Sequence, residues 1–375
     1  MAGKEHHQEG NTLQTMHPVF KELLSGGTAG AFAKSAVAPL ERVKIIIQTS
    51  GALALQDSRR AAAATAVTTS TSTSGGLTTA VVRGGIPMVM RSIVTSEGVR
   101  GLWKGNGASV LRVVPYAALH FSAYERYRTW VLDIDSESLP RHVRSLGQTP
   151  AVDLVAGSMA GATAVSLTYP LDLLRTRMAW RSSGINAPRG PGAEAVGRAA
   201  GLQRSTILSM LGQIARKEGI AGFYKGVSPS LLGIFPYAGL KFFVYQYLKT
   251  LYVKGSPGSE GGSGDLAGVR VATSMKLVFG ACAGLVAQTV TYPLDVVRRR
   301  MQVQDMVTAG DGAQGHHHRI RSSWHGLRLI YTTMGVRRGL YAGLSINYLK
   351  VVPSTAIGFA VYDCAKEYLH HRTHI

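Results

Sequence analysis

The sequence TYPLDLLR at Thr168–Arg175 recurs almost unchanged as TYPLDVVR at Thr291–Arg298 and more loosely as VAPLERVK at Val37–Lys44. Each copy places a proline two residues before an acid, and the acid three residues before a base, within otherwise apolar sequence. Proline removes a backbone hydrogen bond and bends a helix, while residues three apart share a helix face. The pattern predicts three bent helices, each presenting one charge of each sign on the same face.

A pair of glycines with GxxxG spacing precedes each of these prolines at the same offset. The pairs are Gly26 and Gly30, Gly157 and Gly161, and Gly280 and Gly284. Such spacing lets helices approach closely in lipid, and three copies at one fixed distance from a proline indicate an internal repeat. A soluble helical repeat protein is the alternative, but it gives no reason to combine GxxxG with a bending proline.

Each repeat has a second half, in which a short amphipathic stretch such as Ile207–Lys217 precedes another long apolar segment with its own proline. Apolar periodicity therefore predicts six long helices. They lie near residues 19–48, 103–131, 151–180, 224–251, 272–302 and 341–369. All exceed the roughly 20 residues that cross a bilayer, so the predicted fold class is an all-α membrane protein.

The composition indicates an apolar chain with an anionic partner. Hydrophobic residues make up 45% of the sequence and charged residues 17%, while the net charge is +20. Cations interrupt the predicted spans at Lys34, Arg112, Lys241, Lys276 and Lys350. Charges at membrane depth normally face a watery cavity, so these residues predict a polar path through the membrane.

Other classes of function find little support. No Walker loop, serine triad or metal-binding box stands out, so we expect no enzyme activity, no cofactor and no metal. The run at 316–318 is expected to be solvated, because three consecutive histidines cannot converge on one ion. The basic and aromatic residues are scattered over the repeats, so we expect no nucleic-acid partner. Cys282 and Cys364 are expected to be buried core residues.

The repeats and the loops between them divide the chain. We expect a polar tail over 1–18, repeats over 19–135, 150–252 and 271–369, linkers over 136–149 and 253–270, and a tail over 370–375. Within the repeats, residues 50–84, 182–201 and 304–320 are expected to form loose loops, since they are rich in small and polar residues.

These features make the chain resemble the mitochondrial carrier family over about residues 19–369, because the family signature Px[DE]xx[KR] occurs in all three repeats. The resemblance implies six tilted transmembrane helices in threefold pseudo-symmetry around one central cavity, with three short helices on the matrix side. It also implies a monomer in the mitochondrial inner membrane that works by alternating access between two gates.

The resemblance implies a matrix gate built from the three signature stretches. Under threefold symmetry the acid of one helix meets the base of the next. The expected pairs are Glu41 with Arg175, Asp172 with Arg298, and Asp295 with Lys44. Gln48 and Gln302 correspond to glutamine braces beneath these pairs, whereas Ala179 occupies the third position. We therefore expect two braces at most and a latch that opens readily.

A cytosolic gate is implied by the family pattern [FY][DE]xx[KR] near the ends of the even-numbered helices. Its expected residues are Tyr124, Glu125, Arg128, Tyr245, Lys249, Tyr362, Asp363 and Lys366. Gln246 replaces the acid of the second repeat, so one ionic link of this ring is expected to be missing.

Substrate contacts are implied at matching positions of the even-numbered helices and at residues one and two helical turns further on. They are also implied at Lys34 on the first helix, where adenine-nucleotide carriers place a cation. The expected set is Lys34, Arg112, Tyr116, His120, Gly233, Ile234, Tyr237, Lys241, Lys350 and Ser354. Arginine can grip a phosphate bidentately, and the Gly-Ile step resembles the adenine-recognising step of nucleotide carriers. A snorkelling or lipid-contacting role is the alternative for each cation, above all for Lys241.

Within the family, the first repeat most resembles the coenzyme A carriers and the similar ATP-magnesium/phosphate carriers. No EF-hand loop precedes Phe20, and Arg298–Val303 reads RRRMQV rather than the RRRMMM of the ADP/ATP exchanger. We therefore expect transport of coenzyme A or adenosine 3',5'-diphosphate in exchange for an adenine nucleotide. An adenine nucleotide/phosphate carrier is the alternative. Cardiolipin is an expected partner, because Trp103-Lys104-Gly105 and Tyr224-Lys225-Gly226 resemble the family's lipid-binding helix starts.

Overall fold

Six long helices dominate the fold, each with a proline inside it. The computed structural model describes residues 18–64, 76–138, 150–181, 207–254, 272–308 and 320–371, and this part of the chain contains no strand. The long helices are α2 (Pro18–Ala64), α4 (Asn106–Ser138), α6 (Pro150–Arg181), α9 (Val227–Lys254), α10 (Thr273–Thr308) and α12 (Leu344–His371). The predicted all-α fold class and its six long helices are confirmed.

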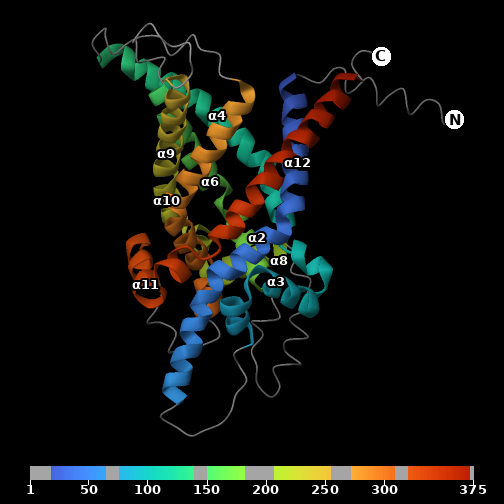
Figure 1. The fold of residues 1–375 in the computed structure, drawn as a ribbon, viewed down its shortest axis with the longest axis vertical. Coiled ribbons are helices and arrows are strands. Elements are labelled where there is room, and N and C mark those ends of the chain that lie inside the picture. The colour runs from blue at the N-terminus through green and yellow to red at the C-terminus, as the bar shows by residue number, and fades with distance from the viewer. Residues whose placement is uncertain are drawn as a thin grey trace, which may run out of the picture.

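Three shorter helices gather at one end of the molecule, which we call the short-helix end (Figure 1). They are α3 (Gly76–Glu97), α8 (Ile207–Glu218) and α11 (Ser323–Gly335). A turn follows each of them: η1 (Val99–Trp103), η3 (Ile220–Tyr224) and η5 (Val336–Leu340). The start of α2 and the end of α12 lie at the opposite end (Figure 1).

The starts predicted for the even-numbered helices were wrong by three residues in every repeat. The predictions placed them at 103, 224 and 341, whereas α4, α9 and α12 begin at Asn106, Val227 and Leu344. Gly105, Gly226 and Gly343 immediately precede these helices with φ values of +86°, +82° and +79°. A left-handed residue interrupts the helical hydrogen bonds, so each helix can begin only after its glycine.

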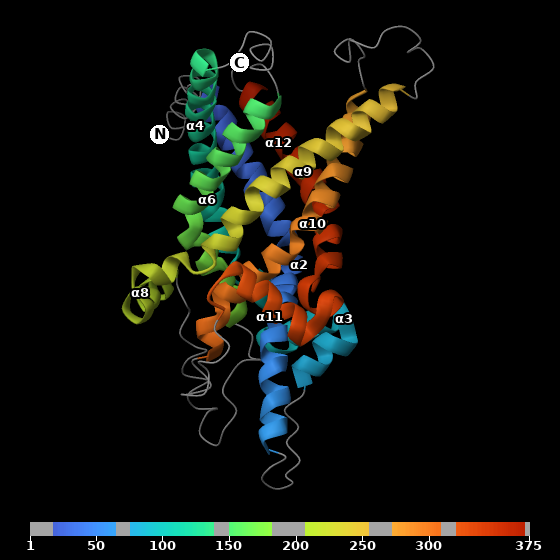
Figure 2. The ribbon, with the colours of Figure 1, turned by 90° about the vertical axis from the view of Figure 1, so that its left-hand side faces the viewer.

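The loop predicted over 50–84 was also wrong in part. Helix α2 continues to Ala64, and α3 begins at Gly76. The alanines that suggested a loose segment have the highest helix propensity of any residue, so they extend α2. Figure 2 shows this extension projecting beyond the short-helix end.

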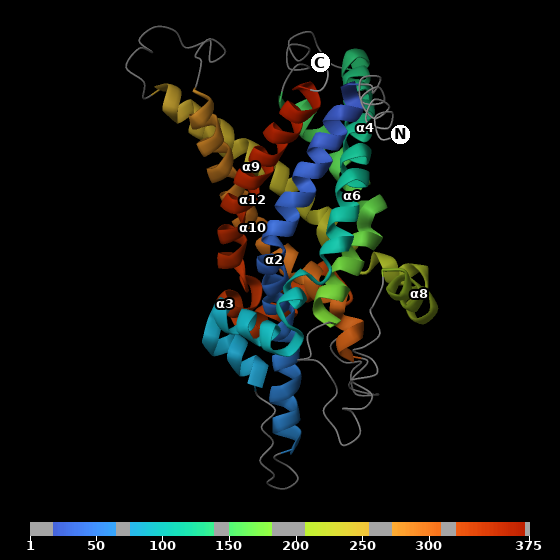
Figure 3. The same cartoon turned by 90° about the vertical axis from the view of Figure 1, so that its right-hand side faces the viewer.

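The long helices form a closed ring. Neighbours in sequence pack together within each repeat, and α4 packs on α6, α9 on α10 and α12 on α2, which joins the last helix to the first. Buried apolar clusters lie toward the short-helix end, one of them around Val43, Ile93 and Ile346 and another around Tyr169, Leu173 and Met210. At the opposite end the helices diverge (Figures 2 and 3).

Only part of the GxxxG prediction holds in this arrangement. A side chain at Gly30 would come within 2.8 Å of Val113 on α4, so here the glycine does allow close helix packing. A Cβ added at Gly26, Gly280 or Gly284 would meet no atom of a neighbouring described residue within 4 Å. These three glycines lie in the diverging half of their helices, so the ring does not bring a partner helix against them in this conformation.

Among the residues that the structure describes, four stretches are long and apolar enough to cross a membrane by length and composition. They are Val152–Trp180, Ile220–Val253, Met275–Met306 and Ser323–Tyr368. Helices α2 and α4 fall outside this set. Both carry charges within their apolar sequence, including Lys34, Glu41 and Arg112, and such charges need a polar interior to face.

Both cysteines contradict their predicted burial, because Cys282 and Cys364 are exposed. The prediction assumed that small apolar residues lie in a core. In a ring of membrane helices the outer surface faces lipid and is also apolar, so hydrophobicity does not distinguish inside from outside.

Candidate functional site

All three predicted interhelical ion pairs form, and they meet where α2, α6 and α10 converge. Arg175 Nη2 contacts Glu41 Oε2, Arg298 Nη2 lies 2.6 Å from Asp172 Oδ2, and Lys44 Nζ lies 2.8 Å from Asp295 Oδ2. Asp172 is only 2% exposed and Glu41 7%. Removing one partner from a buried pair is strongly destabilising, so these contacts hold the three helices together.

Both predicted glutamine braces are present. Gln48 Nε2 donates to Tyr292 OH at 3.1 Å and to Asp295 Oδ2 at 3.2 Å. Gln302 Nε2 donates to Tyr169 OH at 3.0 Å and to Asp172 Oδ2 at 3.1 Å. The two tyrosines were missed at the sequence level, although each directly precedes the signature proline of its repeat.

Asp172 binds two further arginines besides Arg298. Arg299 Nη1 lies 3.2 Å from Asp172 Oδ2 and donates to Thr176 Oγ1 at 2.6 Å. Arg112 Nη1 lies 3.2 Å from Asp172 Oδ1, and its Nε donates to Thr168 Oγ1 at 3.0 Å. Arg299 was not predicted as a site residue; the run of three arginines at the end of its signature was the available signal.

Glu41 is the meeting point of two more of the predicted substrate cations. Lys350 Nζ lies 3.4 Å from Glu41 Oε1, and Lys34 Nζ lies 3.9 Å from the same oxygen. With Arg112 on Asp172, three cations expected to contact substrate therefore touch the carboxylates of the proposed matrix gate. An anion entering from the open end can compete with these carboxylates for the same cations.

Arg112 contacts the first of two aromatic side chains that follow it along one face of α4. Its guanidinium carbon lies 4.9 Å from the centre of the Tyr116 ring, and the Tyr116 and His120 rings are 5.9 Å apart. A cation over a ring face is favourable, and residues four apart share a helix face. The predicted trio Arg112, Tyr116 and His120 thus forms one continuous surface.

The other predicted substrate residues are less closely connected. Ile234 packs against α6, since a side chain at Gly161 would meet its Cγ2 at 3.7 Å, and one at Gly233 would meet Leu294 on α10 at 3.8 Å. Tyr237 and Ser354 are half-buried, while Lys241 is exposed and makes no ion pair within the described part of the chain. The structure does not bring these residues into contact with Arg112 or Lys350.

The residues of the proposed cytosolic gate do not form a ring in this conformation. Tyr124 OH and Arg128 Nε both donate to Asp153 Oδ1, at 2.8 and 2.9 Å, which joins α4 to α6. Glu125, Asp363 and Lys366 are exposed; Lys249, Tyr245 and Tyr362 are half-buried. Within the described residues none of the predicted ionic links across this ring is made. Ion pairs therefore join the helices at the short-helix end, whereas the predicted ring at the opposite end is not formed among the described residues.

A second layer of arginines lies next to the ion pairs, and each arginine donates to a backbone carbonyl of the neighbouring helix. Arg42 Nε donates to Ala179 O at 3.3 Å, Arg177 Nε to Gln302 O at 3.0 Å, and Arg300 Nε to Gln48 O at 3.1 Å. The repeats differ in the further contacts of these arginines: among the described residues, Arg42 and Arg177 each pair with an acid, whereas Arg300 does not.

Arg42 pairs with Glu97 at 2.8 Å and Arg177 with Glu218 at 2.5 Å. Burial alone would raise the pKa of the Glu218 carboxyl, but its hydrogen bonds to Arg177 and Lys225 hold that pKa below its usual value. Met334 occupies the corresponding position of the third repeat. Arg300 is only 4% exposed, and its Nη2 has no hydrogen-bond partner among the residues that the structure describes.

The lysines of the expected lipid-binding turns are engaged with acids. Lys104 Nζ lies 2.9 Å from Glu97, and Lys225 Nζ lies 2.8 Å from Glu218 and 2.6 Å from Asp305. The third repeat has Ala342 at this position. These ammonium groups are therefore partly neutralised within the protein.

A closed ring of six membrane helices in three repeats, with an ionic latch at one end and an open opposite end, defines a membrane transporter rather than an enzyme. The family model for mitochondrial carrier proteins matches residues 15–135, 147–256 and 270–373. The chain belongs to this family, and it is a mitochondrial membrane protein.

Several curated relatives match nearly the whole chain. Mitochondrial carrier protein CoAc1 of Zea mays is 44% identical, over 94% of this chain and 88% of the relative. Mitochondrial coenzyme A transporter SLC25A42 of Rattus norvegicus is 38% identical, over 94% of this chain and 89% of the relative. Solute carrier family 25 member 16 of Mus musculus is 35% identical, over 93% of this chain and 88% of the relative.

Proposed function

We propose that this carrier moves coenzyme A, or adenosine 3',5'-diphosphate, across the mitochondrial inner membrane by alternating access, in exchange for an adenine nucleotide. Similarity to proteins named as coenzyme A carriers in plants and mammals supports the substrate. The contact of Lys34, Arg112 and Lys350 with the gate carboxylates supports the mechanism.

The charge of the cluster fits such a substrate. Seven cationic side chains surround three carboxylates, Glu41, Asp172 and Asp295, which leaves an excess of four positive charges. The cations are Lys34, Lys44, Arg112, Arg175, Arg298, Arg299 and Lys350. A phosphate monoester carries nearly two negative charges at neutral pH, so the 3'-phosphate and diphosphate of coenzyme A supply about four.

The same contacts suggest how binding promotes opening. Arg112 and Lys350 can turn from Asp172 and Glu41 to substrate phosphates, and a charge-assisted bond then replaces the one that is lost. The carboxylates are left with fewer partners, so the matrix gate costs less free energy to separate. A ligand shifts a conformational equilibrium only by binding the two states differently, and this exchange of partners provides such a difference.

The proposal includes the roles given above to the residues of the matrix gate, the cytosolic gate and the substrate site, together with the three repeat boundaries. It also includes a monomeric carrier that binds cardiolipin. Because Lys104 and Lys225 are engaged with acids, we propose that the backbone N–H groups at the starts of α4 and α9 supply most of the lipid-phosphate contacts.

Proteoliposomes test the substrate. We expect labelled coenzyme A to enter vesicles preloaded with ADP, and unlabelled adenosine 3',5'-diphosphate to compete well. The alternative, an adenine nucleotide/phosphate carrier, predicts that ATP-magnesium or ADP competes best and that vesicles preloaded with phosphate support uptake. Removing the 3'-phosphate distinguishes the two: unchanged uptake of 3'-dephospho-coenzyme A would contradict recognition of that group.

A further inference from the structure

The three helix interfaces of the matrix gate are not equivalent. Arg298, Arg299 and Gln302 on α10 bind Asp172 on α6, and Gln302 also binds Tyr169 there. Across the α10–α2 interface, Lys44 and Gln48 bind Asp295, and Gln48 binds Tyr292.

The α2–α6 interface lacks both members of the tyrosine–glutamine pair. Ala38 occupies the position of Tyr169 and Tyr292, and Ala179 that of Gln48 and Gln302. The polar contacts between α2 and α6 include the Glu41–Arg175 pair and the bond from Arg42 to Ala179 O. Lys34 and Lys350 also reach Glu41, but they come from α2 and α12 and do not join α2 to α6.

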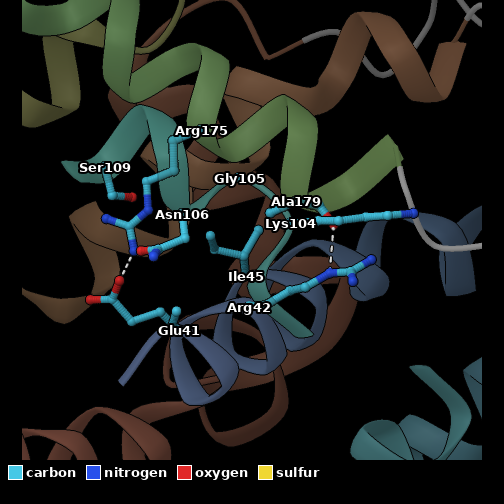
Figure 4. A pocket seen from close by; sticks show the side chains of 10 residues that line it. Glu41, Arg42, Ile45, Lys104, Gly105, Asn106, Ser109, Arg175 and Ala179 are labelled. Carbon is cyan, nitrogen blue, oxygen red and sulfur yellow. Dashed lines mark hydrogen bonds and ion pairs between the residues drawn. The ribbon is translucent and has the colours of Figure 1, made fainter. Parts of the chain in front are cut away.

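A small recess, partly open to solvent, lies at this interface. Its lining includes Ala38, Ala179 and the Glu41–Arg175 pair, so the two alanines that replace the tyrosine and the glutamine both face it (Figure 4). Ser109 also lines it, and within the described part of the chain the buried Ser109 hydroxyl has no hydrogen-bond partner. The corresponding side chain in the second repeat, Ser230, donates to Gly226 O at 3.0 Å.

We propose that the matrix gate opens unevenly, with α2 and α6 separating first while α6 and α10 stay joined as the hinge. The inference rests on the proposed role of the signature pairs as a gate. Separation begins where the fewest contacts are lost. Water that enters the recess reaches the Ser109 hydroxyl and the Glu41–Arg175 pair, and a rising local dielectric weakens that pair.

Distances between α2, α6 and α10 near the short-helix end test the order in which the interfaces separate. Cysteines replace three residues at the same offset from the signature prolines: Ser50→Cys on α2, Arg181→Cys on α6 and Gln304→Cys on α10. They are introduced in pairs into a Cys282→Ser, Cys364→Ser background and spin-labelled. Electron–electron distance measurements in lipid nanodiscs, with and without saturating coenzyme A, follow each interface, and exchange by the labelled protein confirms that it still works.

The expected result is a substrate-dependent population in which the 50–181 distance is longer while the 181–304 distance keeps its ligand-free value. Lengthening of all three distances in the same fraction of molecules would overturn the uneven opening and leave the gate intact. If no distance changes while exchange continues, the assignment of these pairs as a gate fails, and the uneven opening fails with it.

Rebuilding the missing brace gives a second test. Ala179→Gln places an amide where it can bind Glu41 as Gln302 binds Asp172, and adding Ala38→Tyr supplies the partner hydroxyl. We expect the single variant to slow exchange severalfold, the double variant to slow it further, and the population with only α2 and α6 separated to disappear in both. Exchange at the original rate in a folded Ala179→Gln variant, with that population unchanged, would contradict the proposal.

Discussion

Arg300 offers the sharpest test of the electrostatic reasoning, because its repeat lacks the acid that the other two supply. Met334→Glu would restore that acid. A side chain at Gly339 would lie 3.0 Å from Met334 Cβ, much as one at Gly101 would lie 2.8 Å from Glu97 Cβ. Residue 334 therefore lies beside the turn glycine of its repeat, as Glu97 and Glu218 do in theirs.

The magnitude follows from the unpartnered Nη2 of Arg300. A buried donor without an acceptor costs about 1–3 kcal/mol, and burying the new carboxylate consumes part of what the pair regains. We expect Met334→Glu to raise the free energy of unfolding by about 1–2 kcal/mol, which for a chain of this length is a Tm increase on the order of 1–2 °C. Glu218→Met, which breaks an existing buried pair, should lower stability by about 3 kcal/mol or more.

Thermal unfolding of the purified carrier in detergent measures these shifts. Met334→Gln is the matched control, because it offers a neutral acceptor of the same length and should recover less than half of the gain. In an Arg300→Met background the benefit of Met334→Glu should vanish. A lower Tm for Met334→Glu than for the unmodified chain, or an equal gain in the two backgrounds, would refute the reasoning.

Three further outcomes are expected. Arg112→Ala should reduce exchange by roughly 10- to 100-fold or more, because a charged hydrogen-bond donor to the substrate is lost. The Tm should change little, since Arg298 and Arg299 still neutralise Asp172. Full transport in vesicles would remove Arg112 from the site. Gly226→Ala should lower Tm, since φ is +82° and the new Cβ would lie 3.0 Å from Tyr169 OH; an unchanged melting curve would argue against that constraint. The pKa of Glu218 is depressed in the folded protein, so its ion pair stabilises the fold above the usual glutamate pKa of about 4.3, and this stabilisation is lost as pH falls through the lower folded-state pKa. Glu218→Gln should therefore flatten the acid side of a plot of Tm against pH, and an identical slope would count against the pair.

Much of the fold follows from local sequence. Apolar periodicity and the repeated offsets predicted six long helices, and the resemblance to the carrier family implied the three ion pairs that form between them. The helix starts were misplaced because Gly105, Gly226 and Gly343 adopt a left-handed conformation that no hydrophobic pattern reports. The end of α2 was misplaced because a run of alanines was interpreted as a loop.

The sequence by itself determined the threefold repeat and the charges that each signature carries. Which charges meet followed from the threefold symmetry that the family resemblance implies, since it places the acid of each signature next to the base of the following one. Only the tertiary structure showed that Lys34, Arg112 and Lys350 lie on the gate carboxylates, that Arg299 joins Asp172, and that Ala38 and Ala179 leave a recess between α2 and α6. These contacts join residues of different helices and repeats. Their distances depend on how closely the ring closes at each interface, and spacing along a single helix contains no information about that closure.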